Sequence, residues 1–145
     1  MESAKSDNTP TLRKARLPGI VFLAYSMVMP FIIFLIPASE LPVSTGPSEV
    51  FSWMLMLLMP IIILLIYISY RYFRKKPELD NIYGPANLMY MFAMIPSIYA
   101  FIIGFIGSNL RFIAIPFGLG VSIVGFWLAW MFVSSLWETI TFSNQ

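Results

Sequence analysis

The side chains that could carry chemistry in this sequence are methionines and a few carboxylates. Methionines come just before a proline in three apolar stretches, and Cu(I) is a soft ion that prefers thioether ligands of this kind. Two of these stretches supply the candidate copper ligands Met54, Met56, Met59, Met89, Met91 and Met94. The alternative is that methionine, which is flexible and apolar, fills space beside kinked backbone. Successive spans run in opposite directions, which puts the two sets at different depths, so we expect filling, with no metal site and no cofactor.

Two carboxylates stand close together in the central polar segment, residues 71–85. Glu78 and Asp80 follow Lys75 and Lys76, so a solvated charge cluster explains them. A divalent ion held by this loop would suit an enzyme that acts on lipid phosphates at the membrane surface. The sequence has no cysteine and no histidine, which excludes disulfides, a cysteine nucleophile and the usual general base. No Walker loop, dinucleotide-binding glycine pattern or catalytic triad is recognisable, and we predict no catalytic residues.

The composition indicates that most of the chain is surrounded by lipid. Hydrophobic residues make up 59% of the sequence and charged residues only 11%, whereas soluble domains carry about 25% charged residues. A bilayer is crossed by about 20 helical residues, and four uncharged apolar runs are long enough, at residues 17–38, 50–70, 86–107 and 112–137. We therefore predict an all-α integral membrane protein whose transmembrane domain, residues 17–138, contains four helices arranged as two antiparallel hairpins.

The basic residues predict which way these helices cross the membrane. Eight of the nine lysines and arginines lie either in residues 1–16, predicted to be a mobile tail, or in the loop at 71–85. The ninth is Arg111. Because cytoplasmic segments carry the excess of Lys and Arg, we predict that both termini, including the C-terminal tail at 139–145, face the cytoplasm together with the loop. Whether the membrane is the cell membrane or that of an organelle is left open.

Small residues suggest how two of the helices pack. Residues spaced three or four apart lie on one face of a helix, and small residues let transmembrane helices approach closely. The third span carries Ala93, Ser97, Ala100, Gly104 and Gly107, and the fourth carries Ala114, Gly118, Ser122, Gly125 and Ala129. We predict that these two stripes face each other in a tight hairpin; the alternative is that one of them docks a helix of a partner protein. The first two spans show no such stripe and are predicted to pack more loosely.

The sequence favours a non-catalytic role, as an accessory or assembly subunit of a larger membrane complex. Proton-coupled transport needs an ionisable group inside the membrane, and no predicted span contains one. The expected partners are the lipid bilayer and other membrane subunits, and a net charge of +2 does not suggest nucleic acid. Candidate contacts with anionic headgroups or a partner are Arg71, Arg74, Lys75, Lys76, Glu78, Asp80 and Tyr83. The alternatives are a small oligomeric transporter or channel component, lined by methionine and handling copper, and the lipid-interface enzyme.

Overall fold

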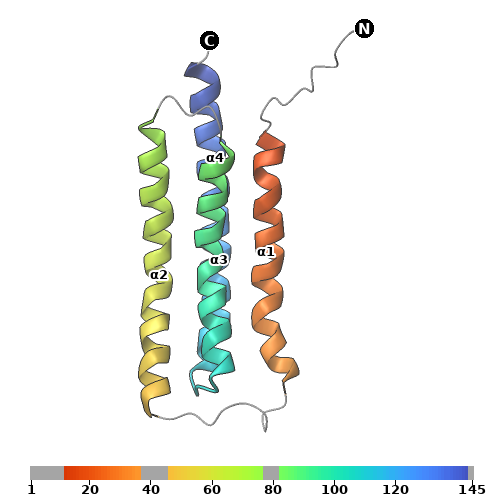
Figure 1. Ribbon diagram of the computed structural model, residues 1–145, viewed down its shortest axis with the longest axis vertical. Coiled ribbons are helices and arrows are strands. Elements are labelled where there is room, and N and C mark those ends of the chain that lie inside the picture. The colour runs from red at the N-terminus through yellow and green to blue at the C-terminus, as the bar shows by residue number, and fades with distance from the viewer. Residues whose placement is uncertain (1–11, 37–45, 77–81, 144–145) are drawn as a thin grey trace.

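The computed structural model describes residues 12–36, 46–76 and 82–143, and these form four helices (Figure 1). They are α1 (Leu12–Leu35), α2 (Gly46–Arg74), α3 (Tyr83–Phe105) and α4 (Arg111–Ser143). Each is long enough and apolar enough to cross a membrane. An isolated span has to satisfy its own backbone hydrogen bonds in lipid, which is the physical reason for helices here.

Most of the helix ends lie beyond the apolar runs from which the helices were predicted, although α3 ends at Phe105, two residues before its predicted end. Helix α1 begins at Leu12, so the basic cluster predicted to lie in the tail is in its first turns. Helix α2 continues to Arg74 and α3 begins at Tyr83, so seven of the fifteen residues predicted to form the loop belong to helices. Helix α4 continues to Ser143. Arginine and lysine are good helix formers, so a helix does not have to end where the hydrocarbon does.

Helices α3 and α4 lie next to each other in the middle of the bundle, with α2 on one side and α1 on the other (Figure 1). Both α1 and α2 contact α3 and α4, but within the described residues they do not contact each other. The predicted first hairpin is therefore not a packed pair. The physical reason is that the buried faces of both helices are turned toward α3 and α4, which separate them.

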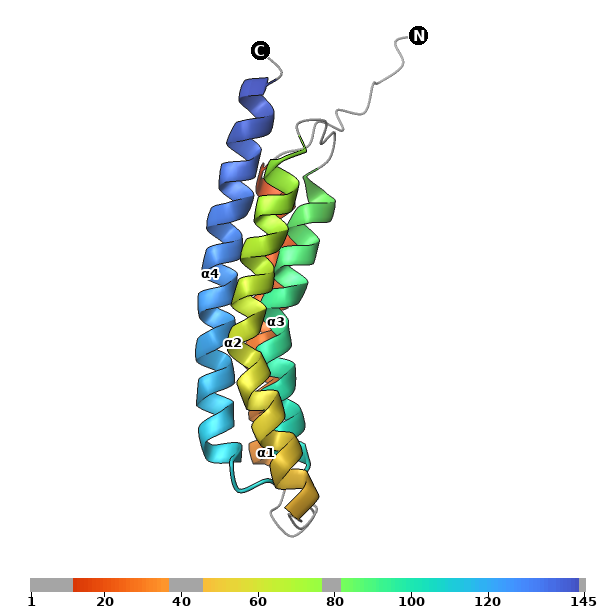
Figure 2. The same cartoon turned by 90° about the vertical axis from the view of Figure 1, so that its left-hand side faces the viewer.

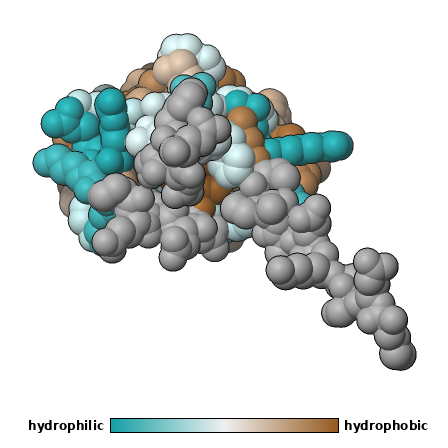
Figure 3. Space-filling view, turned by 90° about the horizontal axis from the view of Figure 1, so that it is seen from above, coloured by the Kyte–Doolittle hydropathy of each residue, from teal (hydrophilic) through white to brown (hydrophobic). Residues whose placement is uncertain are grey.

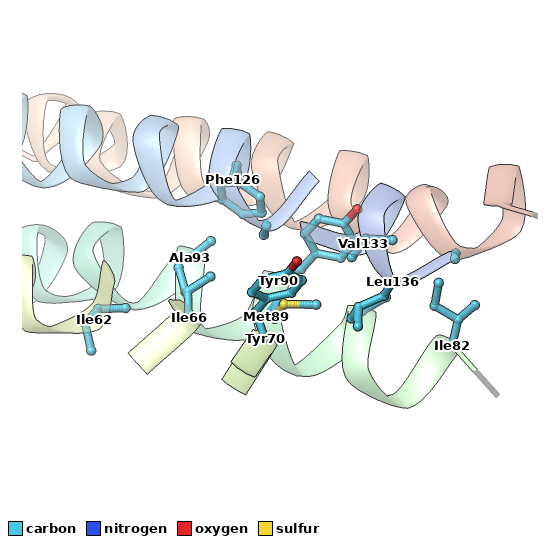
Figure 4. Packing of buried hydrophobic residues seen from close by; sticks show 13 residues of the cluster. Ile62, Ile66, Tyr70, Ile82, Met89, Tyr90, Ala93, Phe126, Val133 and Leu136 are labelled. Atoms are coloured by element: carbon cyan, nitrogen blue, oxygen red, sulfur yellow. The ribbon is translucent and has the colours of Figure 1, made fainter. Parts of the chain in front are cut away.

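The buried side chains form two clusters along the bundle. The larger contains residues from all four helices, and Figure 4 shows Tyr90 at its centre, between Phe126 on one side and Val133 and Leu136 on the other. The smaller is formed by Leu55, Met59, Ala100, Ile103 and Ala114. Helix α2 contributes to both with a narrow line of buried residues spaced three or four apart: Ser52, Leu55, Met59, Ile62, Ile66 and Tyr70.

One end of the bundle gathers most of the basic residues. The start of α1, the end of α2, the start of α3 and the end of α4 all lie there (top of Figure 1), and α4 projects past the others (Figure 2). We call it the basic end, and its basic residues are Arg13, Lys14, Arg16, Arg71, Arg74, Lys75 and Lys76. Figure 3 looks down on this end, where hydrophilic side chains stand at the rim. Arg111 begins α4 at the opposite end.

Candidate functional site

The small residues of α4 lie against α3 at two glycines. A Cβ atom added at Gly118 would lie 2.6 Å from the Cβ of Ala100 and 2.8 Å from the carbonyl oxygen of Pro96. A Cβ atom added at Gly125 would lie 3.3 Å from the Cα of Ala93. The backbones of the two helices therefore approach closely where the sequence places glycine.

Other members of the two stripes have different neighbours. A Cβ atom added at Gly104 would lie 3.0 Å from a side-chain carbon of Ile33, so this glycine faces α1 and not α4. Gly107 lies beyond the end of α3, where its φ of 72° suits glycine. Ala114 belongs to the smaller buried cluster and Ala129 to the larger one.

Two serines join α3 to α4 inside the bundle. The hydroxyl of Ser97 donates to Oγ of Ser122 at 3.0 Å, and the backbone N–H of Ser97 donates to the same atom at 3.1 Å. Both serines are fully buried. Ser97 follows Pro96, which lies inside α3. The polar groups of the residue after this proline thus have a partner on the neighbouring helix, and such partners allow prolines inside transmembrane helices.

The structure does not bring the six candidate methionines together. Met59 is buried in the smaller cluster, Met89 in the larger one, and Met54 and Met91 are more than half exposed. Met94 lines a cavity of about 120 Å³ between α1 and α3, together with Met29 and the hydroxyl-bearing Ser26 and Ser97. The Ser26 hydroxyl is buried without a hydrogen-bond partner in the described residues.

The basic residues at the end of α2 and directly after it point outward. Arg71, Arg74, Lys75 and Lys76 are all exposed. The Arg74 guanidinium lies 5.9 Å from the centre of the Tyr70 ring, and Nζ of Lys76 lies 4.6 Å from the centre of the Tyr72 ring. Tyr83 is half-buried at the start of α3. The predicted contacts Glu78 and Asp80 lie outside the described residues.

One carboxylate that the sequence did not single out fastens α2 to the turn between α3 and α4. Glu49, in the first turn of α2, accepts a hydrogen bond from the Ser108 hydroxyl and another from the backbone N–H of Asn109, both at 3.0 Å. The sequence signal was weak, because Glu49 reads as one of two acidic residues beside a polar loop.

Helix α1 has a stripe of small residues, which corrects the prediction that it has none. Ala15, Gly19 and Ser26 are buried on one face. A Cβ atom added at Gly19 would lie 2.7 Å from two ring carbons of Tyr90, so the aromatic ring of α3 rests directly on the α1 backbone. The gap of seven residues between Gly19 and Ser26 hides the pattern in the sequence.

Arg16 was predicted to lie in the tail, but it is turned into the bundle. One of its terminal nitrogens donates to the Ser134 hydroxyl at 2.6 Å, and its guanidinium carbon lies 4.6 Å from the centre of the Trp130 ring. A guanidinium over an aromatic face is attracted by the ring's quadrupole. Nε of Arg16 is buried and has no hydrogen-bond partner in the described residues.

Next to Arg16, a groove of about 350 Å³ runs between α1 and α4. Its walls are almost entirely apolar, formed by Gly19, Ile20, Leu23, Ile123, Phe126, Trp127 and Trp130. Trp130 is both a wall of the groove and the ring under the Arg16 guanidinium. The groove therefore combines apolar walls with a cation, Arg16, next to one of its lining residues. Among the described residues, we take it as the best candidate for a binding site.

Comparison with models of known protein families, with curated proteins and with solved structures gives no match. The class of protein follows from the helices themselves. Four helices that are long and apolar enough to span a membrane are compatible with an integral, multi-pass membrane protein.

Proposed function

We propose that this chain is a non-catalytic subunit that joins a larger membrane complex through the outer face of α2. The observation that carries the proposal is the continuous apolar line that this helix leaves uncovered along its length. Helix α2 is 29 residues long, yet it buries one narrow line of side chains against α3 and α4. Because α1 lies on the far side of the bundle, no other described helix covers the rest of its circumference.

The uncovered part of α2 forms a continuous apolar stripe. Residues spaced three or four apart along it are 47% to 69% exposed: Trp53, Leu57, Ile61, Leu64 and Ile68. We call these five residues the outer stripe of α2. Apolar ridges at this spacing fit the grooves of another transmembrane helix. The occupant we propose is an apolar transmembrane helix of a different protein.

Polar contacts hold α2 in place near both of its ends, which supports a docking role. Glu49 fastens its start to the α3–α4 turn. Near its other end, the Tyr70 hydroxyl lies 3.1 Å from the Ser135 hydroxyl, and the Tyr70 ring stacks on Phe132 with 4.3 Å between ring centres. A helix held in this way presents its outer face in a fixed orientation, so a partner binding there would lose little conformational entropy.

Site-specific photo-crosslinking in cells tests this proposal. A photoreactive residue at Leu57, Ile61 or Leu64 should give one crosslinked product of the same mass from all three positions. The same residue at Phe117 or Val124, which are also exposed but lie on α4, should give none. A Leu57→Trp change should weaken the product obtained from Leu64. A chain that purifies in mild detergent as a stable monomer, and crosslinks from α2 only to lipid, would contradict the proposal.

We propose in addition that the basic end faces the cytoplasm and that α3 and α4 form the tight hairpin of the bundle. The first rests on the charge difference between the two ends, and the second on the close approach at Gly118 and Gly125. The copper-handling alternative gains no support from the positions of the methionines. The enzyme alternative depends on Glu78 and Asp80, which lie outside the described residues.

A further inference from the structure

Beside the apolar groove between α1 and α4 lies the guanidinium of Arg16, whose Nε has no hydrogen-bond partner in the described residues. Its α4 wall runs from Ile123 to Trp130, which is about 10 Å along a helix at the usual rise per residue. On the α1 side, Arg16, Gly19 and Leu23 are spaced three and four apart, so they lie on one face of the helix. The groove therefore ends at Arg16, on the side of the basic end.

The Arg16 guanidinium still has hydrogen-bonding capacity. An arginine carries five N–H donors, and the structure shows one of them on the Ser134 hydroxyl. The Nε donor is buried without a partner in the described residues. A buried donor without an acceptor costs free energy, more so on a charged group. An anionic oxygen that accepts a hydrogen bond from this Nε–H would remove that cost.

A second unpaired polar group lies close to the same place. Tyr90 is fully buried, and its hydroxyl has no hydrogen-bond partner in the described residues. Its ring rests on Gly19, which is a wall of the groove. A guanidinium with an N–H donor to spare is well suited to the oxygens of a phosphate group.

We propose that this groove binds one anionic phospholipid, with an acyl chain between α1 and α4 and the phosphate at Arg16. Arg13 and Lys14 lie in the preceding turn of α1 and add positive charge beside the headgroup. The walls offer almost no polar surface, which suits an acyl chain. Basic pockets between transmembrane helices on the cytoplasmic side are known to bind anionic headgroups. The site is separate from the exposed basic residues at the end of α2, which lie on the other side of the bundle.

Native mass spectrometry of the purified full chain in detergent tests this site. The probes are phosphatidylglycerol and phosphatidylcholine with identical acyl chains at equal concentration. The unmodified protein should retain one phosphatidylglycerol per chain in preference to phosphatidylcholine. Arg16→Gln should reduce that preference about fivefold, the effect expected of one basic residue near the headgroups. The matched control is Arg71→Gln, which removes an exposed charge from the same end and should leave the preference unchanged.

A second pair of variants tests the acyl-chain slot without touching any charge. Ile123→Trp places a large side chain in the groove and should lower the retention of both lipids several-fold. Val124→Trp is the control, because Val124 is the next residue on α4, is similarly exposed and does not line the groove. Size-exclusion chromatography checks that each variant is folded.

Three results would each overturn the assignment. The first is folded Arg16→Gln protein that keeps the full preference for phosphatidylglycerol. The second is an equal loss of preference in Arg71→Gln protein, which would mean that the lipid is attracted only by the surface charge of the basic end. The third is displacement of phosphatidylglycerol by an equal concentration of inorganic phosphate, since a lipid held by its acyl chain should not be displaced in this way. The proposal does not depend on the docking role of α2, because none of these variants alters the outer stripe.

Discussion

At the scale of single residues, the polar side chains buried in this bundle join one helix to another. The Ser122 hydroxyl accepts two hydrogen bonds from Ser97, one from its backbone and one from its side chain. Lipid offers no water to replace these partners, so the loss of the acceptor would leave two buried donors unpaired. Their contribution to stability is nevertheless moderate, because a helix separated in the membrane finds other partners.

We expect Ser122→Ala to lower the free energy of unfolding by about 1 kcal/mol, the usual range for an interhelical hydrogen bond in a membrane protein. Titration with a denaturing detergent, followed by tryptophan fluorescence, measures this change. The control is Thr139→Ala, which removes a hydroxyl that donates to the Ser135 carbonyl of its own helix and should change stability by less than half as much. Equal effects of the two substitutions would mean that the contact between α3 and α4 contributes nothing of its own.

The contacts of Arg16 could not be predicted from the sequence around it. It reads as one of three basic residues before an apolar run, and topology alone explains such a cluster. Its hydrogen-bond partner Ser134 is 118 residues away along the chain. Only the packing of the first helix against the last brings the two together, and no local pattern predicts that pairing. The same holds for Gly19 and Tyr90.

At the scale of helices, the contact between α3 and α4 depends on the absence of side-chain atoms at Gly118. The nearest obstacles to a Cβ atom there are the Ala100 Cβ, at 2.6 Å, and the Pro96 carbonyl oxygen, at 2.8 Å. Neither belongs to a flexible side chain that could move aside. Any larger residue at this position would therefore push the two helices apart along their length.

We expect Gly118→Ala to destabilise the protein by about 1–3 kcal/mol, the usual cost of overpacking a tight contact. Thermal unfolding in detergent, monitored by circular dichroism, measures the effect. Gly120→Ala is the matched control, since a Cβ atom at Gly120 meets nothing within 4 Å and alanine is the better helix former. If Gly118→Ala were as stable as Gly120→Ala, the close approach of α3 and α4 would be wrong.

How much of the arrangement the sequence predicts differs from helix to helix. The four spans follow from apolar runs of sufficient length, because lipid leaves the backbone no alternative to a helix. Helix ends are less predictable. The first apolar run begins at Leu17, whereas the helix begins five residues earlier, at Leu12. The prediction of a first hairpin did not anticipate that α1 packs on α3 and α4 and, within the described residues, not on α2. The contact between α1 and α3 depends on how the Tyr90 ring fits against Gly19. An apolar sequence pattern does not predict such a fit.

The candidate site was less predictable than the helices. Small residues at Gly118, Ser122 and Gly125 could be picked out because their spacing is regular. The groove between α1 and α4 could not, since its walls are ordinary lipid-facing residues such as Ile20 and Ile123 until the two helices lie side by side. A groove is a property of two surfaces, and each helix alone shows only half of it.

At the scale of the whole molecule, the two ends of the bundle differ in charge. Seven of the described basic residues lie at the basic end, whereas Arg111 lies at the other. This difference exceeds what any single helix shows, because the start of α1 and the end of α2 both place basic residues at the basic end. Lysine and arginine are retained on the cytoplasmic side during insertion, so the sum of charges should decide the orientation of all four helices together.

Cysteine labelling measures this orientation directly, because the chain has no cysteine of its own. Asn109→Cys places a thiol on the exposed turn between α3 and α4, and Thr139→Cys places one on the exposed part of α4 at the basic end. If the basic end is cytoplasmic, a membrane-impermeant maleimide should label Asn109→Cys in intact cells. It should label Thr139→Cys only after the membrane is permeabilised, and denatured protein gives the full signal for both. The reverse pattern would mean that the basic end faces outward, and the anionic lipid proposed for the α1–α4 groove would then have to come from the outer leaflet.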